Sequence, residues 1–91
     1  EIVEENDEIV ERFKNIELFL NKSLSDLILK YGKADFSKIE SVYEFHRYNT
    51  DNCRIFVQNK SVDKTIINIT IYNYKNNFFI ETYSKDLCTK I

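Results

Sequence analysis

The two cysteines, Cys53 and Cys88, are the residues with the most definite chemistry in this sequence. Cys53 begins a segment of alternating polarity, and Cys88 follows the last such segment, so the two side chains can meet at one edge of a sheet. A disulfide between them would hold the C-terminal segment on the sheet and would indicate an oxidising compartment. The alternative is a pair of free, buried cysteines in a cytosolic protein.

A catalytic thiol is the second chemistry to consider, because His46 and Asp51 lie close to Cys53 in the chain. Cysteine catalysis also requires an oxyanion site and a substrate cleft, and a chain with 1 glycine and short loops has little from which to build them. We therefore expect no catalytic residues and no enzymatic activity, with His46 paired to a neighbour on a strand. No CxxC or HxxxH spacing is present, so we expect neither a metal nor a cofactor.

Two amphipathic helices are predicted in the N-terminal part. Over residues 7–20, with Asn6 or Asp7 as N-cap, apolar residues recur at helical spacing: Ile9, Phe13, Ile16 and Leu20. A second helix begins at Ser23, which together with Asp26 resembles a capping box, and ends at Gly32. A left-handed helix cap is the conformation expected of this glycine.

The remaining chain alternates with a period of two, which is typical of strands. Strands are expected over residues 42–48, 53–58, 65–74 and 78–83, and a final helical turn, capped by Ser84, over residues 84–90. In the third of these strands Ile67, Ile69 and Ile71 are expected to face the helices, and Ile66 to face away. The short turns between the strands favour antiparallel pairing.

The predicted fold is therefore one α+β domain over residues 1–91, with residues 1–6 frayed. Two N-terminal helices pack on one face of a three- to four-stranded antiparallel meander and form a two-layer sandwich, because the helices are the available cover for an apolar sheet face.

Aromatic side chains on the opposite face of this sheet are the predicted functional surface. The candidate anchors for a protein partner are Tyr48, Phe56, Tyr72 and Tyr74. In the alternative, the C-terminal segment covers this face and the sheet has a core on both sides.

The charge of the chain argues against other partners. Net charge is −2, and residues 1–11 carry acidic side chains without a basic one, so we expect no nucleic acid partner. No apolar stretch approaches the ~20 residues of a membrane span, so we expect contact with a membrane only through an anchor outside this chain.

Several of these residues resemble known bacterial families. The segment from Leu29 to Asp35, followed by an aromatic strand over 43–48, resembles the signature Leu-Gly-x-Pro-Asp of BamE/SmpA-like small envelope lipoproteins, with Ala34 in place of the proline. Residues 20–91 also resemble a family of uncharacterised two-cysteine alphaproteobacterial proteins at Gly32, Glu40, Tyr48, Cys53 and Cys88. These resemblances imply an exported protein, in the periplasm or at the inner face of the outer membrane, with an outer-membrane assembly component as partner.

The predicted function is thus a non-enzymatic, exported protein-binding or assembly module. The alternative is a cytoplasmic immunity or inhibitor protein that binds a toxin or an enzyme, a role that suits small acidic α+β proteins. That alternative predicts reduced cysteines, whereas export predicts a disulfide.

Overall fold

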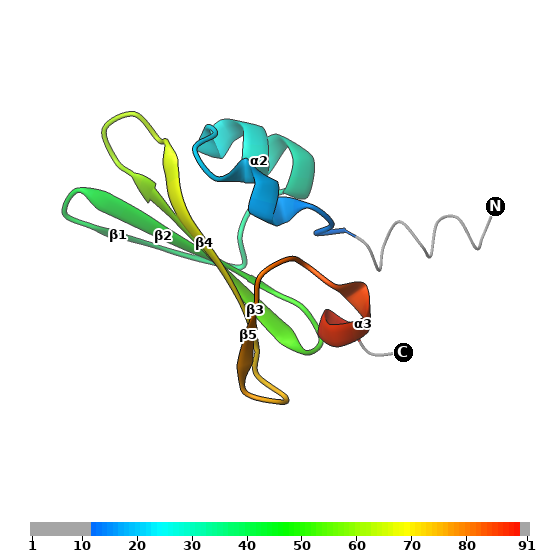
Figure 1. The fold of residues 1–91 in the computed structure, drawn as a ribbon. Helices are drawn as coiled ribbons and strands as arrows, with labels where there is room; N and C mark the ends of the chain where they lie inside the picture. Colours follow the sequence, from blue (N-terminus) through cyan, green and yellow to red (C-terminus); the bar gives the residue numbers. More distant parts are fainter. Residues whose placement is uncertain (1–11, 90–91) are drawn as a thin grey trace.

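A computed structural model describes residues 12–89 and contains a five-stranded antiparallel sheet with short helices on one side (Figure 1). The strands follow one another in the sheet in chain order. The elements, in sequence, are the 3-10 helix η1 (Ile16–Phe19), helix α2 (Leu24–Tyr31), the strands β1 (Phe36–Glu40), β2 (Tyr43–Asn49), β3 (Cys53–Lys60), β4 (Ile66–Asn73) and β5 (Phe78–Ile80), and helix α3 (Lys85–Cys88).

The prediction of two N-terminal helices on a three- to four-stranded meander is wrong. Residues 12–15 form a turn and only Ile16–Phe19 follow as the 3-10 helix η1. Asn15 and Asn21 have φ of 67° and 71°, and these left-handed residues interrupt any regular helix on both sides of η1. The expected N-cap at Asn6 or Asp7, the frayed residues 1–6 and the acidic residues 1–11 lie outside the described part of the chain. The fold is mostly sheet.

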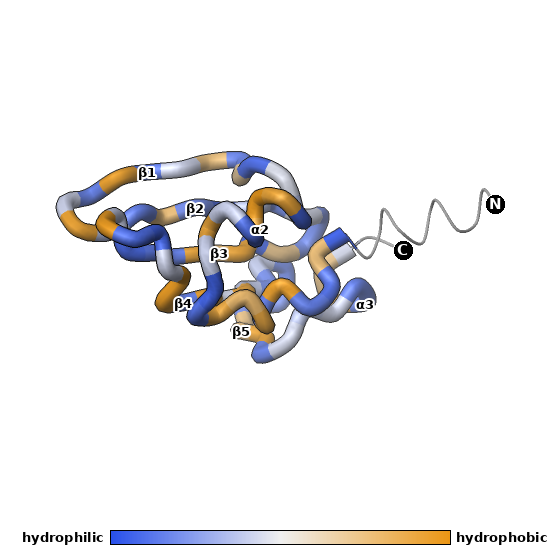
Figure 2. The backbone as a smooth tube through the Cα atoms, turned by 90° about the horizontal axis from the view of Figure 1, so that it is seen from above, coloured by the Kyte–Doolittle hydropathy of each residue, from blue (hydrophilic) through white to orange (hydrophobic). Residues whose placement is uncertain are grey.

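Strand β1 is the strand that the prediction lacked. All five of its residues are exposed, with Ile39 at 71%, so its sequence has no buried face for alternation to reveal. Its position comes from antiparallel pairing with β2, in which Phe36 lies opposite Arg47 and Glu40 opposite Tyr43. Seen from above, β1 forms one edge of the sheet and α3 lies toward the other edge, near β5 (Figure 2).

Helix α2 begins after Ser23 and ends before Gly32, as its sequence signals predict, but the capping box predicted with Asp26 is wrong, because the Asp26 N–H donates to the Ser23 backbone carbonyl and not to the Ser23 hydroxyl. The Ser23 hydroxyl accepts a hydrogen bond from the Ser25 N–H at 3.1 Å, and the Gly32 N–H donates to the Ile28 carbonyl at 2.7 Å. Gly32 differs from the expected left-handed helical cap, because its φ of 87° is combined with a ψ of −179°. That region is essentially restricted to glycine, so the one glycine of the chain occupies a position that requires it.

The core lies between the sheet and the helices. Strand β3 alternates regularly, and Ile55 and Val57 are buried against Ile71 of β4 and Leu27 of α2. Phe13 contributes an aromatic cluster in which its ring centroid lies 5.9 Å from Tyr31 and 5.2 Å from Tyr48; the core also includes Ile16, Cys53, Ile66 and Cys88. The described helices all lie on this side of the sheet (Figure 1).

A β-bulge at the start of β4 changes the predicted facing of its isoleucines. Asn59 pairs with Ile66, but Gln58 pairs with Asn68, so Ile67 is the additional residue. Ile66 exchanges backbone hydrogen bonds of 2.8 Å with Asn21 and Lys22 and is fully buried in the core. The expectation that Ile66 faces away from the helices is therefore wrong, whereas Ile69 and Ile71 do pack on the helix side.

Candidate functional site

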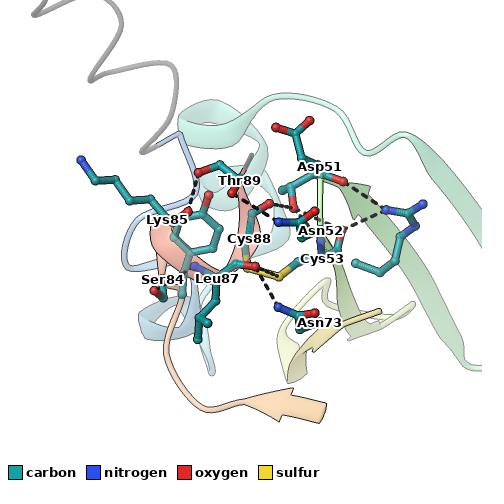
Figure 3. The surroundings of a disulfide bond; sticks show 12 residues. Asp51, Asn52, Cys53, Asn73, Ser84, Lys85, Leu87, Cys88 and Thr89 are labelled. Atoms are coloured by element: carbon teal, nitrogen blue, oxygen red, sulfur yellow. Dashed lines mark hydrogen bonds between the residues drawn. A yellow bond between two sulfur atoms is a disulfide. The ribbon is translucent and has the colours of Figure 1, made fainter. Parts of the chain in front are cut away.

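The predicted disulfide is confirmed. Cys53 at the start of β3 and Cys88 at the end of α3 are bonded, with their Cα atoms 4.9 Å apart and both side chains fully buried (Figure 3). The bond joins residues 35 positions apart, and it holds α3 against the start of β3 on the side of the sheet that α2 also covers (Figure 1).

Polar side chains reinforce this attachment. Asn73 Nδ2 donates to the Leu87 carbonyl at 2.8 Å, and the Cys88 carbonyl accepts from the Asn52 N–H at 2.9 Å and from Thr50 Oγ1 at 2.8 Å (Figure 3). The last carbonyls of a helix have no partners within it, so these donors satisfy groups that would otherwise be buried without one. The sequence did not reveal the roles of Asn73, the last residue of β4, and Thr50, in the β2–β3 turn, because neither position carries a local signal of a distant acceptor.

The thiol site considered from the sequence is not assembled. Cys53 carries no free thiol, because its sulfur is bonded to Cys88. His46, on β2, is paired with neighbours as expected: its Nδ1 lies 2.8 Å from Ser37 Oγ and its Nε2 lies 3.0 Å from Asn59 Oδ1. No group of three or more His, Cys, Asp and Glu side chains within residues 12–89 is placed to hold a metal ion.

The bonds around Asn59 determine the tautomer of His46. Asn59 Nδ2 donates to Glu44 Oε1 at 3.1 Å and to the Lys60 carbonyl at 2.9 Å, which leaves Asn59 Oδ1 as an acceptor. The His46 Nε2 atom must therefore carry a proton, and in the neutral imidazole Nδ1 then accepts from the Ser37 hydroxyl. This network joins β1, β2 and β3 on the helix side of the sheet.

Glu44 is the charged end of the network. Its side chain is buried on β2, and its carboxylate accepts hydrogen bonds from Lys64 Nζ and from Asn59 Nδ2. The hydrogen bond from Lys64, followed by the one from Asn59, lowers the pKa of Glu44 below the ordinary glutamate value. Glu44 is therefore ionised and paired at neutral pH, as a buried carboxylate requires.

The opposite face of the sheet, which we call the open face, is the candidate binding surface. The strand registers place on it residues from all five strands: Phe36, Lys38, Glu40, Tyr43, Phe45, Arg47, Arg54, Phe56, Gln58, Lys60, Asn68, Thr70, Tyr72 and Phe79. The described helices lie on the other side (Figure 1). The sequence reading that placed the C-terminal segment over this face is wrong for the described part, because the disulfide and its polar contacts hold α3 elsewhere.

Three of the four predicted anchors are accessible. Phe56 is 42% exposed on the open face, and Tyr72 packs against Phe79 there with ring centroids 4.9 Å apart. Tyr74, 38% exposed, follows β4, where the Arg54 guanidinium lies 4.2 Å from its ring centroid and its hydroxyl donates to the Asp51 carbonyl. These contacts place Tyr74 at the end of the face near the turn that joins β2 and β3.

Tyr48, the fourth predicted anchor, is a core residue. It is 1% exposed, and it lies opposite Ile55 in the register, on the helix side of the sheet. Its prediction as an exposed anchor is wrong, because strand alternation alone does not say which of the two faces of β2 is covered.

A shallow groove of 280 Å³ crosses the open face and involves residues that the sequence reading did not select. Its aromatic lining comes from Phe36 on β1, Phe45 on β2 and Phe56 on β3, with Arg47 among them. The Arg47 guanidinium carbon lies 5.1 Å from the Phe36 ring centroid. Alternation along β2 places Phe45 and Arg47 on the same face. Their approach to Phe36 depends on strand β1, which the sequence did not predict.

Comparisons with protein-family models, with curated proteins and with solved structures give no significant match. None of the helices formed by residues 12–89 has the length and the apolar character needed to cross a membrane.

Proposed function

We propose that this protein is a non-enzymatic, exported protein-binding module, and that its partner binds the open face. The observation that carries the proposal is the set of large apolar side chains left in contact with solvent on that face. Phe36, Phe56 and Phe79 are 51%, 42% and 69% exposed, and they come from three different strands. Exposed aromatic residues gathered on one surface are typical anchors of protein interfaces.

The disulfide supports the proposed compartment. Disulfides persist in oxidising environments and are rare in cytosolic proteins, and the Cys53–Cys88 bond is buried and reinforced by hydrogen bonds from Thr50 and Asn73. Together with the resemblance to BamE/SmpA-like lipoproteins, this bond favours the periplasm or the inner face of the outer membrane. The partner is then an assembly component of the envelope.

A site-specific photo-crosslinking experiment tests the proposal. A benzoylphenylalanine is introduced at Phe56 on the open face and, as matched control, at Leu29, which is 88% exposed on α2. We expect irradiation of cells of the source organism to link the Phe56 variant to one defined envelope protein, identified by mass spectrometry, and the Leu29 variant to give no such product. Equal products from both positions would contradict the assignment of the surface.

A loss-of-binding variant completes this test. Truncation of Phe56 and Phe79 to alanine is expected to abolish the crosslinked complex, detected from a third position at Tyr43, without unfolding the domain, because neither ring belongs to the core. The matched control truncates Val62, which is 88% exposed in the β3–β4 turn. A cytoplasmic partner recovered with reduced cysteines would instead support the inhibitor alternative.

A further inference from the structure

We propose that the groove on the open face is a carboxylate-binding site, in which Arg47 pairs with an aspartate or glutamate of an extended segment of the partner. An apolar side chain beside that carboxylate would rest on Phe45 and Phe56. The inference rests on the proposed function, and it adds the chemistry that the partner must present.

The groove has the composition of a site for an acidic group with an apolar neighbour. Three phenylalanines form its walls, and its polar lining includes Gln58 of β3 and Asn68 of β4, which lie opposite each other in the register. The Phe36 ring supports the Arg47 guanidinium at 5.1 Å. A guanidinium held against an aromatic ring still presents its N–H groups at the edge of its plane, where a carboxylate can accept two parallel bonds.

Arg47 is a cation in the groove that has no carboxylate partner within residues 12–89. Within residues 12–89 its Nε atom is buried and has no hydrogen-bond partner, and no ion pair involves it. Lys38, the other cation in the groove lining, is already paired, with its Nζ 2.9 Å from Glu40 Oε2. An arginine with a buried, unsatisfied Nε and no carboxylate partner is unfavourable, and a carboxylate that pairs with the Nη atoms of the guanidinium would offset this cost.

The rest of the open face makes an acidic partner favourable as well. Its charged strand residues are Lys38, Arg47, Arg54 and Lys60, against the single acid Glu40. Arg54 is engaged within the protein, since its Nη1 donates to the Thr50 and Cys53 carbonyls at 3.2 and 3.1 Å. Net positive charge on the face attracts an acidic segment, whereas one unpaired arginine in a chain of net charge −2 is a poor match for a polyphosphate backbone.

Nuclear magnetic resonance titration of the intact, disulfide-bonded protein tests this site with defined probes. The probes are the amidated peptide acetyl-Phe-Glu-Phe, its acetyl-Phe-Gln-Phe counterpart and a thymidine dodecanucleotide. We expect the glutamate peptide to shift the Arg47 side-chain N–H and the amide signals of Phe36 and Phe56. Its affinity should exceed that of the glutamine peptide by about fivefold, because a charged acceptor strengthens the bonds to a guanidinium.

Variants of Arg47 test whether this residue causes the preference for the glutamate peptide. Arg47→Gln is expected to remove the preference for the glutamate peptide, and Arg47→Lys to retain only part of it, because lysine keeps the charge but not the planar fork. The matched control, Lys60→Gln, removes a cation of the same face outside the groove and should leave the preference unchanged. Equal binding of both peptides, shifts confined to other surfaces, or tighter binding of the oligonucleotide would each overturn the proposal.

The same Arg47→Gln variant separates this inference from the proposed function. If the open face binds the partner but the groove takes no carboxylate, Arg47→Gln forms the crosslinked complex from Tyr43 at the wild-type level while the double alanine variant of Phe56 and Phe79 does not. If the proposed function is wrong, the double variant also forms the complex.

Discussion

The Tyr48 hydroxyl donates to the carbonyl of Gly32 at 2.5 Å, and this bond joins the end of α2 to strand β2. The neighbouring Tyr31 carbonyl accepts from Arg12 Nη2 at 2.7 Å, so two successive carbonyls at the end of the helix are satisfied by side chains from other parts of the chain. Gly32 can turn its carbonyl toward Tyr48 because its φ and ψ angles lie in a region of conformational space that other residues essentially cannot adopt. One glycine and one tyrosine thus set how α2 meets the sheet.

Gly32→Ala is predicted to destabilise the protein by about 1–3 kcal/mol, the cost of an alanine in that backbone region. An added Cβ would also lie 3.2 Å from Arg12 Nη2, so the cap on the Tyr31 carbonyl would have to shift. Urea unfolding followed by circular dichroism measures the change. Lys33→Ala, at an exposed neighbouring position, is the control, and equal midpoints for the two variants would contradict the role of Gly32.

Alkaline pH is predicted to weaken the fold through two tyrosines. Burial raises the pKa of Tyr31 to about 12, with a further contribution from Glu17, and burial raises the pKa of Tyr48 to about 12. Because these values lie above the ordinary 10.0, the stabilisation is complete below pH 10 and is lost as the pH rises through the folded values near 12. Unfolding free energies measured across this range should fall steeply for the wild type.

Removing the two hydroxyls provides the check on this effect. The double variant Tyr31→Phe and Tyr48→Phe should be less stable at neutral pH, since the Lys14 and Gly32 carbonyls lose their donors, but its stability should depend less on pH above 10.0. Tyr72→Phe, whose hydroxyl donates to Asn77 at the surface, is the control and should keep the wild-type slope. A double variant with an unchanged slope would refute the assignment.

Loss of the disulfide is predicted to lower the free energy of unfolding by roughly 3–4 kcal/mol, because the cross-link closes a long loop in the unfolded chain. The comparison is urea unfolding of the oxidised protein and of the double variant Cys53→Ala and Cys88→Ala. Adding a reductant to the double variant should change nothing, which controls for nonspecific effects of the reductant.

The redox state in the cell tests the proposed compartment. Intact-mass analysis after thiol trapping in the source cells should find neither cysteine labelled, whereas labelling of both would argue for the cytoplasmic alternative.

Acidic pH is predicted to remove the contribution of Glu44 to the stability of the fold. Its pKa is lowered chiefly by the hydrogen bond from Lys64, so its stabilisation is present above the ordinary value of 4.5 and is lost as the pH falls below it, through the folded pKa. Glu44→Gln should cost about 1 kcal/mol at pH 7, and the difference from the wild type should shrink in acid. Glu40→Gln, which disrupts an exposed pair with Lys38, should cost little at either pH.

Local signals in the sequence were sufficient for the short elements that depend on neighbours in the chain. Helix α2 lies between Ser23 and Gly32, as predicted. Ser84 caps α3, also as predicted, by accepting a hydrogen bond from the Leu87 N–H at 3.4 Å. The strands β2, β3 and β4 were also recognised, because a half-buried strand alternates in polarity. The same periodicity failed for residues 7–20, where helical spacing of apolar residues gave only the short η1 within the described part.

Tertiary contacts decided what local pattern could not. Ile66 turns into the core because its backbone pairs with Asn21 and Lys22, residues more than forty positions away, and Tyr48 is buried because α2 covers its side of the sheet. Strand β1 exists by pairing with β2 and has no buried face of its own. The candidate groove depends on that pairing, which brings Phe36 beside Arg47.

The sequence by itself therefore determined the two ends of α2, the N-cap of α3, the alternation of three strands and the two cysteines available for a bond. Only the tertiary structure decided which face of each strand is covered, how many strands the sheet contains and which aromatic side chains remain exposed. The physical reason is that caps and periodicity arise from hydrogen bonds and burial within a few residues, whereas register and facing depend on contacts between distant segments.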